Sequence, residues 1–312
     1  MTTLAHRLSL LMPGSLAQRL RPLWHRAQVE AQFRMRGGRI EYDRELHCRI
    51  ACREFGGRRL EVAVRSFREL RRFLNFNSEK GDVVADWMGW ISDCEVLYDI
   101  GSANGLEGFY VNHMHGSRIV FVEPYAPSIE TLLKTVARRV KTGGSSERFE
   151  VVHAGCDNKT GYERYLFHGL PNAGETGNTF ADADAYCRGG KGHLPIVLSQ
   201  WVAGVSLDSL HWKYGLPLAT HVKIDIDGFE LRALEGAKEL LKSGNVRSWA
   251  IECNGRDQLA KIAGIMDKHD YVDVAQFEHY PGYEHYTGDH IYMRKDLVDS
   301  WYEAFPASRS SL

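Results

Sequence analysis

Long apolar runs are missing from this 312-residue chain. Its longest candidate for a membrane segment, Leu8–Met12, falls far short of the roughly 20 apolar residues that a spanning helix needs. A secretory signal is not expected either, because Pro13 and Gly14 interrupt the stretch and arginines follow it. We therefore expect a cytoplasmic protein, with a peripheral position on the inner face of a membrane as the alternative.

Cysteine is also scarce, with six residues in the whole chain. Only Cys48 and Cys52 lie close together, and a C-x-x-x-C spacing matches neither a common zinc motif nor a redox motif. Alternation with period two would place both thiols on the same side of a strand. We interpret them as buried, reduced side chains that pack as small apolar groups.

Acidic residues are missing from the start of the chain, where none precedes Glu30. Residues 1–80 hold 16 arginines and one lysine against eight acidic residues, a net charge of +9, so the remainder carries −10. Such a basic arm suggests an anionic partner: a membrane surface, an acidic glycan or a nucleotide. The alternative is that its arginines pair with the acidic body of the protein itself. No nucleic-acid partner is expected.

Leucines recur at helical spacing within residues 1–30, and arginines accompany them. A segment of this kind can lie on an anionic membrane, so peripheral membrane contact is one prediction for it. The competing prediction is that these leucines pack on the body of the protein or on a second subunit, which would make the protein a homo-oligomer.

The pattern of predicted helices and strands changes near residue 80. Residues 4–36 are predicted to be helical, residues 40–55 and 59–64 to form a β-hairpin, and residues 66–74 a short helix. The alternation turns the two cysteines to one side of the hairpin, and we expect the apolar residues of 59–64 to pack beside them. We divide the chain into an Arg-rich extension, residues 1–80, and a second domain, residues 81–312.

From residue 95 onward, apolar strands alternate with helices. Strands are predicted at residues 95–100, 119–123, 150–154, 221–226, 246–252, 271–276 and 290–294. Helices are predicted at residues 105–115, 126–140, 229–241 and 256–269. Strands that are apolar on both faces and alternate with helices indicate an α/β fold with a doubly wound, mostly parallel, Rossmann-like sheet. Residues 155–220 read as a long irregular insertion that shapes a pocket for a second substrate.

A glycine-rich turn follows the first of these strands. Asp99 comes two residues before Gly101, and Gly105 opens a helix whose free backbone N–H groups can approach a ligand. The spacing G-x-x-x-G-x-x-G is wider than the dinucleotide fingerprint G-x-G-x-x-G. Asp99 would also repel a pyrophosphate yet suits an ammonium group, so a cationic amino-acid ligand fits better.

Glu123 ends the second strand, where a carboxylate can accept both hydroxyls of a ribose. S-adenosylmethionine has both the amino-acid half that suits Asp99 and the nucleoside half that suits Glu123, although either acid alone could be a helix cap or an ion-pair partner. Small residues at the end of the third strand leave room for adenine. The predicted cofactor-binding residues are Asp99, Gly101, Ser102, Ala103, Asn104, Gly105, Glu123, Pro124, Ala154 and Cys156.

Two aspartates, Asp225 and Asp227, end the fourth strand, and they are the predicted catalytic residues. Doubly wound sheets bind ligands in the crevice at this end of their strands. There Asp225 would act as a base toward an acceptor hydroxyl or orient that hydroxyl. The alternative is that Asp225 forms a structural pair with Lys223.

Metal ligands are not predicted in this chain. The oxygen ligands that Mg²⁺ would find at the strand ends are Asp225, Asp227, Glu252 and Asn254. No spacing demands a metal there, so Mg²⁺ is an unfavoured alternative. The histidines at positions 279, 285 and 290 match no zinc signature.

Taken together, these motifs resemble the FkbM family of methyltransferases. The resemblance covers roughly residues 80–295 and rests on Asp99–Gly105, Glu123-Pro124, Asp208 and Lys223–Glu230 with Leu234 and Gly236. It implies a class I methyltransferase fold, S-adenosylmethionine as donor, and O-methylation of a sugar or polyketide hydroxyl. Two positions depart from the family pattern: Asn104 lies one position late with Ala103 in its place, and Asp227 replaces Glu.

The sequence thus predicts an S-adenosylmethionine-dependent O-methyltransferase whose acceptor is a small molecule or glycan, most simply a sugar hydroxyl. In such a reaction the protein has to position the two substrates and accept a proton from the acceptor hydroxyl. It does not need a nucleophilic side chain. The alternatives are a non-catalytic cofactor-binding or scaffold protein, which would need none of the three acids at the strand ends, and a nicotinamide-dependent dehydrogenase, which the glycine spacing disfavours.

Overall fold

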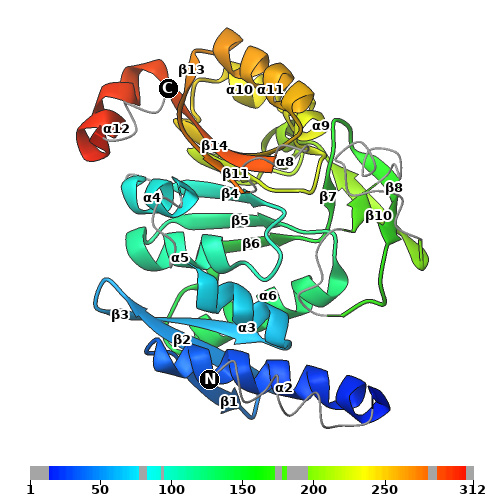
Figure 1. The fold of residues 1–312 in the computed structure, drawn as a ribbon. Helices are drawn as coiled ribbons and strands as arrows, with labels where there is room; N and C mark the ends of the chain where they lie inside the picture. The colour runs from blue at the N-terminus through cyan, green and yellow to red at the C-terminus, as the bar shows by residue number, and fades with distance from the viewer. Residues whose placement is uncertain are drawn as a thin grey trace.

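A computed structural model of the chain has an α/β body whose central sheet is covered by helices, with an N-terminal layer stacked on one side (Figure 1). The structure describes residues 14–76, 83–92, 95–172, 178–180, 196–279 and 287–306, and its description of side chains begins at residue 23. The domain boundary predicted at residue 80 falls outside the described residues. No helix within them is long and apolar enough to cross a membrane.

The central sheet has seven strands in the order β13-β14-β12-β11-β4-β5-β6. Its parallel strands are β4 (Val96–Ile100), β5 (Arg118–Val122), β6 (Phe149–Val152), β11 (His221–Ile224) and β12 (Ser248–Asn254). β14 (Thr287–Arg294) lies antiparallel between β12 and β13 (Tyr271–Glu278). The predicted α/β class with a mostly parallel, Rossmann-like sheet is confirmed.

Helices cover both faces of this sheet (Figure 1). On one side are α4 (Val83–Trp90), α5 (Leu106–His115) and α6 (Ala126–Lys141), and on the other are α8 (Leu207–Trp212), α9 (Glu230–Glu235), α10 (Lys238–Lys242) and α11 (Arg256–Lys268). Successive side chains of a strand point to opposite faces of the sheet, so each strand contributes to two separate cores. In β4, Leu97 packs with α5, whereas Tyr98 packs on the face covered by α8 to α11. A last helix, α12 (Val298–Ala304), follows β14.

One predicted helix, residues 229–241, is in fact two, α9 and α10, and the break lies at Gly236. A Cβ atom at Gly236 would meet the backbone oxygen of Asp157 at 2.4 Å, so this turn packs directly against the chain that follows β6. Asp208 fixes the start of α10 because its carboxylate accepts the backbone N–H groups of Glu239 and Leu240 at 3.0 and 2.9 Å.

The extension contains α2 (Gly14–Met35), β1 (Arg39–Asp43), β2 (Cys48–Phe55), β3 (Arg58–Val64) and α3 (Phe67–Asn75). Its sheet has three antiparallel strands, one more than the predicted hairpin. The predicted pairing of side chains is wrong. Leu60 pairs with Arg53 and Val62 with Ala51, so the apolar residues of β3 lie on the face opposite to Cys48 and Cys52. Both thiols are buried and free, as predicted.

This antiparallel sheet packs on α5 and α6, so the extension and the body share one core. Leu60 and Val62 belong to the same apolar cluster as Phe109 of α5. The backbone N–H of Ala63 donates to the Thr135 hydroxyl of α6 at 2.9 Å.

The stretch predicted to be irregular, residues 155–220, contains a second sheet at the end of the central one (Figure 1). Its strands are β7 (Gly155–Cys156), β8 (Gly161–Phe167), β9 (Thr179–Phe180) and β10 (Leu198–Val205), in the order β7-β10-β8-β9. Tyr165, Phe167 and Val202 form its core with Tyr125. The prediction of irregular structure was wrong: β8 and β10 have seven and eight residues, and β7 and β9 have two each.

Candidate active site

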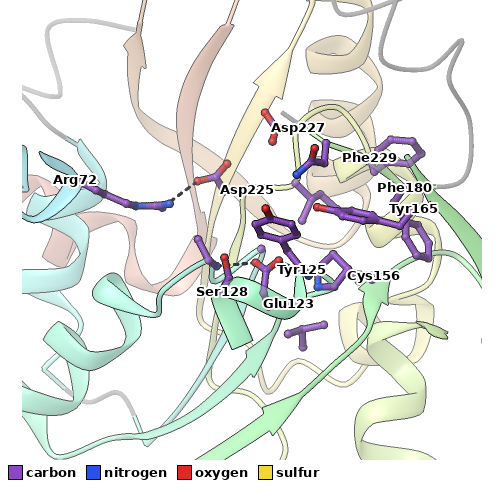
Figure 2. Close-up of a pocket in the computed structure, with 17 residues that line it drawn as sticks. Arg72, Glu123, Tyr125, Ser128, Cys156, Tyr165, Phe180, Asp225, Asp227 and Phe229 are labelled. Atoms are coloured by element: carbon purple, nitrogen blue, oxygen red, sulfur yellow. Dashed lines mark hydrogen bonds and ion pairs between the residues drawn. The ribbon is translucent and has the colours of Figure 1, made fainter. Parts of the chain in front are cut away.

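A cleft of about 700 Å³, counting its solvent-open part, lies at the carboxyl ends of β4, β5 and β11 (Figure 2). The main sheet supplies Gly101 and Ala103, Glu123 and Pro124, and Asp225 and Asp227. The second sheet supplies Cys156, Tyr165, Asn178 and Phe180, and α3 of the extension supplies Arg72.

The predicted site residues divide into two groups. Those that line the cleft are Gly101, Ala103, Glu123, Pro124, Cys156, Asp225 and Asp227. Those that lie behind its walls are Asp99, Ser102, Asn104, Gly105 and Ala154, each buried. Cofactor binding and catalysis by individual residues stay predictions, and the geometry below shows what each residue can do.

The turn between β4 and α5 is held open by backbone conformations that favour glycine. Gly101 and Gly105 have φ angles of +77° and +75°. A Cβ atom on Gly101 would also lie 1.9 Å from the backbone oxygen of Asp225. This turn therefore touches the loop after β11 through main-chain atoms, with no side chain between them.

Several buried polar atoms in and beside this turn are available to a ligand. The hydroxyl of Ser102, both amide atoms of Asn104 and Oδ1 of Asp99 have no hydrogen-bond partner in the part of the chain that the structure describes. Buried polar atoms in proteins are nearly always hydrogen-bonded, so such a group calls for an explanation. A polar ligand seated on the turn would provide one, and the donor set fits the amino-acid end of S-adenosylmethionine.

Glu123 is buried at the end of β5, with 6% of its surface exposed. One carboxylate oxygen accepts the backbone N–H of Ala103 at 2.7 Å and the other accepts that of Tyr125 at 2.8 Å. Each oxygen keeps a second lone pair, which suits the two hydroxyls of a ribose. Burial raises the pKa of Glu123 to about 7, against the pull of these two backbone donors.

Asp99 is both a helix cap and an ion-pair partner, the structural roles that the sequence analysis gave as alternatives to ligand binding. Its Oδ2 accepts the backbone N–H of Gly108 in the first turn of α5 at 3.2 Å, and its Oδ1 lies 3.8 Å from Lys223 Nζ. Burial raises the pKa of Asp99 to about 6, although Lys223 opposes this effect. Asp99 thus caps a helix and pairs with a lysine, and its binding to an ammonium group stays a prediction.

Five charged side chains meet beneath the cleft, and we call them the charge network: Arg72, Asp99, Glu107, Lys223 and Asp225. Lys223 Nζ lies 3.2 Å from Asp225 Oδ2. Arg72 Nη2 lies 3.1 Å from Glu107 Oε1 and 3.9 Å from Asp225 Oδ2. The pair that the sequence offered as the alternative for Asp225 is therefore present, within a larger group.

Asp225 is the member of the charge network most open to the cleft, with 36% of its side chain exposed. Burial would raise its pKa, but Lys223 and then Arg72 outweigh that effect and hold the pKa of Asp225 below its usual value. Burial alone would lower the pKa of Lys223, yet the carboxylates of Asp225 and Asp99 raise it. Both groups are therefore charged at neutral pH.

The loop after β11 departs from the strand that the sequence predicted there. β11 ends at Ile224, and Asp227 has a φ angle of +54°, so it does not follow the alternation of the strand. Glu230 holds this loop, because its Oε1 accepts the backbone N–H groups of Ile226 and Gly228 at 3.2 and 2.9 Å. Glu230 is fully buried, and burial raises its pKa to about 7.

Aromatic side chains form the wall opposite the main sheet (Figure 2). Tyr125, Tyr165, Phe180 and Phe229 line this wall, and Tyr165 and Phe180 lie in the stretch, residues 155–220, that the sequence connected with the pocket for a second substrate. Tyr125 donates its hydroxyl to the backbone oxygen of Asn172 at 2.8 Å.

Arg72 and Glu107 were missed by the sequence reasoning. Glu107 sits in the first turn of the helix after the glycines, which is a usable signal for a residue near the site. Arg72 had no such signal, because it is one of four arginines within residues 65–72 and belongs to the extension.

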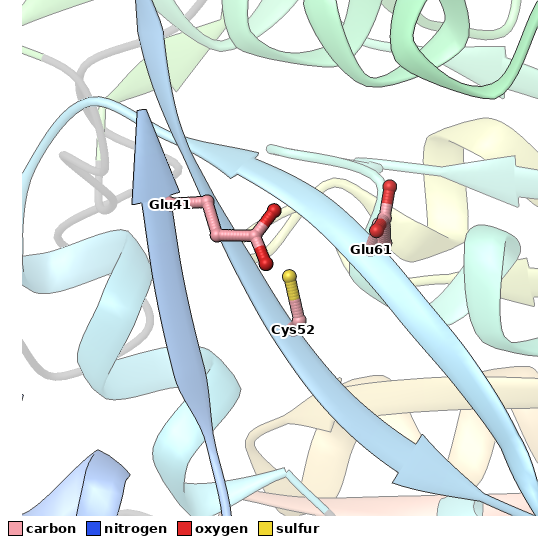
Figure 3. A group of neighbouring side chains, drawn as sticks. All are labelled: Glu41, Cys52 and Glu61. Atoms are coloured by element: carbon pink, nitrogen blue, oxygen red, sulfur yellow. The ribbon is translucent and has the colours of Figure 1, made fainter. Parts of the chain in front are cut away.

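The residues considered for metal binding do not form one cluster. In the described part of the chain, one group of three His, Cys, Asp or Glu side chains brings its ligand atoms within 4.8 Å of one another. It consists of Glu41, Cys52 and Glu61, in the extension (Figure 3). Arg59 already occupies that group, at 2.5 Å from Glu41, 3.0 Å from Glu61 and 3.0 Å from the Cys52 sulfur. Mg²⁺ at the strand ends remains the unfavoured alternative.

The histidines lie in ion pairs or outside the described residues. His279 Nε2 lies 3.1 Å from Asp289, and His290 Nδ1 lies 2.6 Å from Asp273. His285 is not among the described residues. At the acids considered for magnesium, the Asn254 amide donates to Glu252 at 2.9 Å.

Comparison with solved structures yields distant matches. A methyltransferase FkbM from Methylobacillus flagellatus KT is 18% identical, with a TM-score of 0.46; the match covers 72% of this chain, which spans only 53% of that protein. A precorrin-6y C5,15-methyltransferase from Geobacter metallireducens GS-15 is 15% identical, with a TM-score of 0.39 and coverages of 69% and 88%. TrmK of M. capricolum, in complex with S-adenosyl-homocysteine, is 12% identical, with a TM-score of 0.37 and coverage of 68% of each chain.

No curated protein matches the chain. The family model described as the methyltransferase FkbM domain matches residues 99–277, which is more than half of the chain. The match begins at the acid before the glycine turn and includes both Glu123 and Asp225, the two carboxylates that flank that turn in the cleft. The chain therefore belongs to the FkbM family of S-adenosylmethionine-dependent methyltransferases.

Proposed function

We propose that this methyltransferase transfers the methyl group of S-adenosylmethionine to a hydroxyl oxygen of a sugar or glycan. The observation that carries the proposal is the position of two carboxylates in one cleft. Glu123 and Asp225 follow β5 and β11, and β4 with its glycine turn lies between those two strands. One carboxylate is therefore available for the nucleoside end of the cofactor and the other for the reacting end.

In this proposal, Glu123 and the glycine turn bind the cofactor, and Asp225 binds the acceptor. Glu123 accepts the ribose hydroxyls, and the turn Gly101–Gly105 receives the amino-acid end. The cofactor supplies an electrophilic methyl group on a positively charged sulfur. Asp225, held ionised by Lys223, accepts a hydrogen bond from the acceptor hydroxyl and takes up its proton as the oxygen attacks.

The walls of the cleft support a sugar as the acceptor. Aromatic rings of Tyr165 and Phe180 offer flat apolar faces, while Asp225 and Asp227 on the other side offer acceptors for hydroxyl groups. A sugar combines an apolar C–H face with a rim of hydroxyls, so it matches both walls at once.

Peripheral membrane contact through residues 1–30 and a homo-oligomeric state stay predictions. Residues 1–13 and the side chains of residues 14–22 lie outside the description. Two arginines of the extension have acidic partners in the body, Arg65 with Glu130 and Arg72 with Glu107 at 3.1 Å. These pairs favour the alternative in which arginines of the extension pair with the acidic body of the protein.

Two measurements test the proposal. Calorimetry on the purified protein should show S-adenosylmethionine binding in the presence of EDTA, and labelled S-adenosylmethionine should transfer its methyl group to one member of a panel of glycans and nucleotide sugars. A protein that binds NAD and not S-adenosylmethionine would refute the cofactor. Transfer that EDTA abolishes and Mg²⁺ restores would change the role of Asp225 from proton acceptor to metal ligand.

A further inference from the structure

Arg72 connects the extension to the reacting end of the cleft. It belongs to α3, outside the family domain at residues 99–277, yet it lines the cleft and points toward Asp225 (Figure 2). Its Nη2 atom lies 3.1 Å from Glu107 Oε1 and 3.9 Å from Asp225 Oδ2. Among the described side chains that line the cleft, it is the only cation.

The position of Arg72 is determined by the packing of α3 rather than by chance at the surface. Ser66 and Glu69 form a capping box at the start of the helix, with the Glu69 N–H donating to the Ser66 hydroxyl at 3.2 Å. At its end, the Arg53 guanidinium donates to the backbone oxygens of Phe73 and Phe76 at 3.0 and 3.2 Å. Both helix ends are thus tied down.

The apolar side of α3 adds to this anchoring. Leu70 and Phe73 are fully buried in the core that also contains Phe109 of α5, the helix that follows the glycine turn. A guanidinium carried by such a helix loses less freedom on pairing than one on a loose arm. Arg72 can therefore hold a neighbouring carboxylate in one orientation.

We propose that Arg72 is a positioning residue for methyl transfer, which holds the Asp225 carboxylate ionised and oriented toward the cleft, so that the extension completes the active site. This inference rests on the proposed function in one respect, the role of Asp225 as the group that receives the acceptor hydroxyl. In this proposal, residues 39–76 contribute to the reaction through Arg72, in addition to packing on the body of the protein.

The charges around Asp225 come from several elements. The cationic side is Lys223 on the preceding strand, Arg72 on α3 and, when protonated, His279 just after β13. The acidic side is Asp99 on β4, Glu107 on α5, Glu252 on β12 and Asp227 on its own loop. Among the described side chains that act on Asp225, loss of the Arg72 charge leaves Lys223 as the one permanent cation.

The test is a carboxyl titration of Asp225 by NMR on ¹³C-aspartate-labelled full-length protein, with D225N to assign the signal. In R72Q the midpoint of Asp225 should rise by about one pH unit or more, because an opposite charge at this distance has been removed. R72K should give an intermediate value, since a lysine cannot contact Glu107 and Asp225 together. R71Q, which changes the exposed neighbour on the same helix, should leave the midpoint unchanged.

An unchanged Asp225 midpoint in folded R72Q would overturn the inference, as would an equal rise in R71Q. If R72Q does not fold, R72K decides the question with the same two outcomes. The titration needs neither cofactor nor acceptor, so it gives a result even if the proposed reaction is wrong, and calorimetry with S-adenosylmethionine on the same samples reports that failure separately. Once an acceptor is known, the acidic limb of the kcat/KM profile should move upward in R72Q.

Discussion

Two groups of charged side chains in this protein have similar composition and different surroundings. The outer cluster, on the sheet of the extension, joins Glu41, Cys52 and Glu61 to Arg59 and Arg138. Figure 3 shows its two glutamates and its cysteine. The charge network, beneath the cleft, joins Asp99, Glu107 and Asp225 to Arg72 and Lys223. In the outer cluster, Arg138 also pairs with Asp43 at 3.1 Å, and burial raises the pKa of Cys52 and keeps its thiol neutral.

The charge network has three carboxylates for two cations, and one of its carboxylates opens onto the cleft. An excess negative charge in a cleft attracts a cationic ligand. The sulfonium and ammonium groups of S-adenosylmethionine are cationic. The comparison indicates that access to a cleft, rather than residue type, separates a candidate binding site from a structural ion pair.

The largest expected effect comes from D225N, which keeps the shape of the side chain and removes its charge. Turnover of the acceptor should fall by at least about 100-fold, the usual lower range for a group that takes up a proton in the reaction. E61Q, the matched change in the outer cluster, should leave turnover near that of the wild type. Steady-state assays with labelled S-adenosylmethionine measure both. A D225N enzyme with a near-normal rate would remove Asp225 from catalysis.

The next effect concerns the cofactor. E123A should weaken S-adenosylmethionine binding by about 1.5–3 kcal/mol, the value for loss of charged hydrogen bonds to the ribose. E41Q, in the outer cluster, should bind the cofactor as the wild type does. Isothermal calorimetry at one pH provides both numbers, and circular dichroism checks that E123A is folded. Equal affinity in E123A would place the ribose elsewhere.

A smaller effect depends on pH. Burial raises the pKa of Glu230 from 4.5 to about 7 in the folded state, so the folded protein holds this proton more tightly than the unfolded chain. Glu230 therefore lowers the stability of the folded state as pH rises from 4.5 to 7. Urea unfolding should show E230Q gaining at least about 1 kcal/mol on the wild type between pH 5 and pH 8.

The control for this pH effect is E239Q, which changes an exposed glutamate paired with Lys242. Its stability difference from the wild type should be constant over the same range. If the E230Q difference is constant as well, Glu230 titrates normally, and the loop after β11 is not held by a buried carboxyl group.

The smallest effect is expected within the outer cluster itself. The side chains of Arg59 and Glu41 are 37% and 46% exposed, so water and salt screen their ion pair. E41Q should change the free energy of unfolding by less than about 1 kcal/mol, as for other exposed pairs. Urea unfolding with and without 1 M NaCl measures this, and a larger loss that persists in salt would contradict the view that the cluster is solvent-screened.

Much of the fold was predictable because it depends on local pattern. Apolar strands such as β4 and β5 are buried on both faces, and they stand out from the helices between them. The positions of Glu123 and Asp225 followed from the same pattern, since carboxyl ends of parallel strands meet at one edge of a sheet. Both residues indeed line one cleft.

The parts that could not be predicted depend on contacts distant in the sequence. Arg72 reaches the cleft only because the extension packs on α5. No local sequence motif predicts that packing. In the second sheet, β7 and β9 are too short to show a period, and β8 pairs with β10 across the 30 residues, 168–197, that separate them in the sequence. Asp99 looked like a ligand because it precedes the glycines, but whether such an acid faces a ligand or caps the next helix depends on a rotation of its side chain.

The contact at Gly101 links the two halves of the cleft mechanically. Its main chain lies against the Asp225 carbonyl, so the glycine turn and the loop that carries Asp225 and Asp227 are in direct contact. A ligand that moves one of these segments is therefore expected to displace the other. If cofactor and acceptor bind on the two sides of this contact, their binding is thermodynamically linked: the factor by which the cofactor changes the affinity for the acceptor equals the factor by which the acceptor changes the affinity for the cofactor.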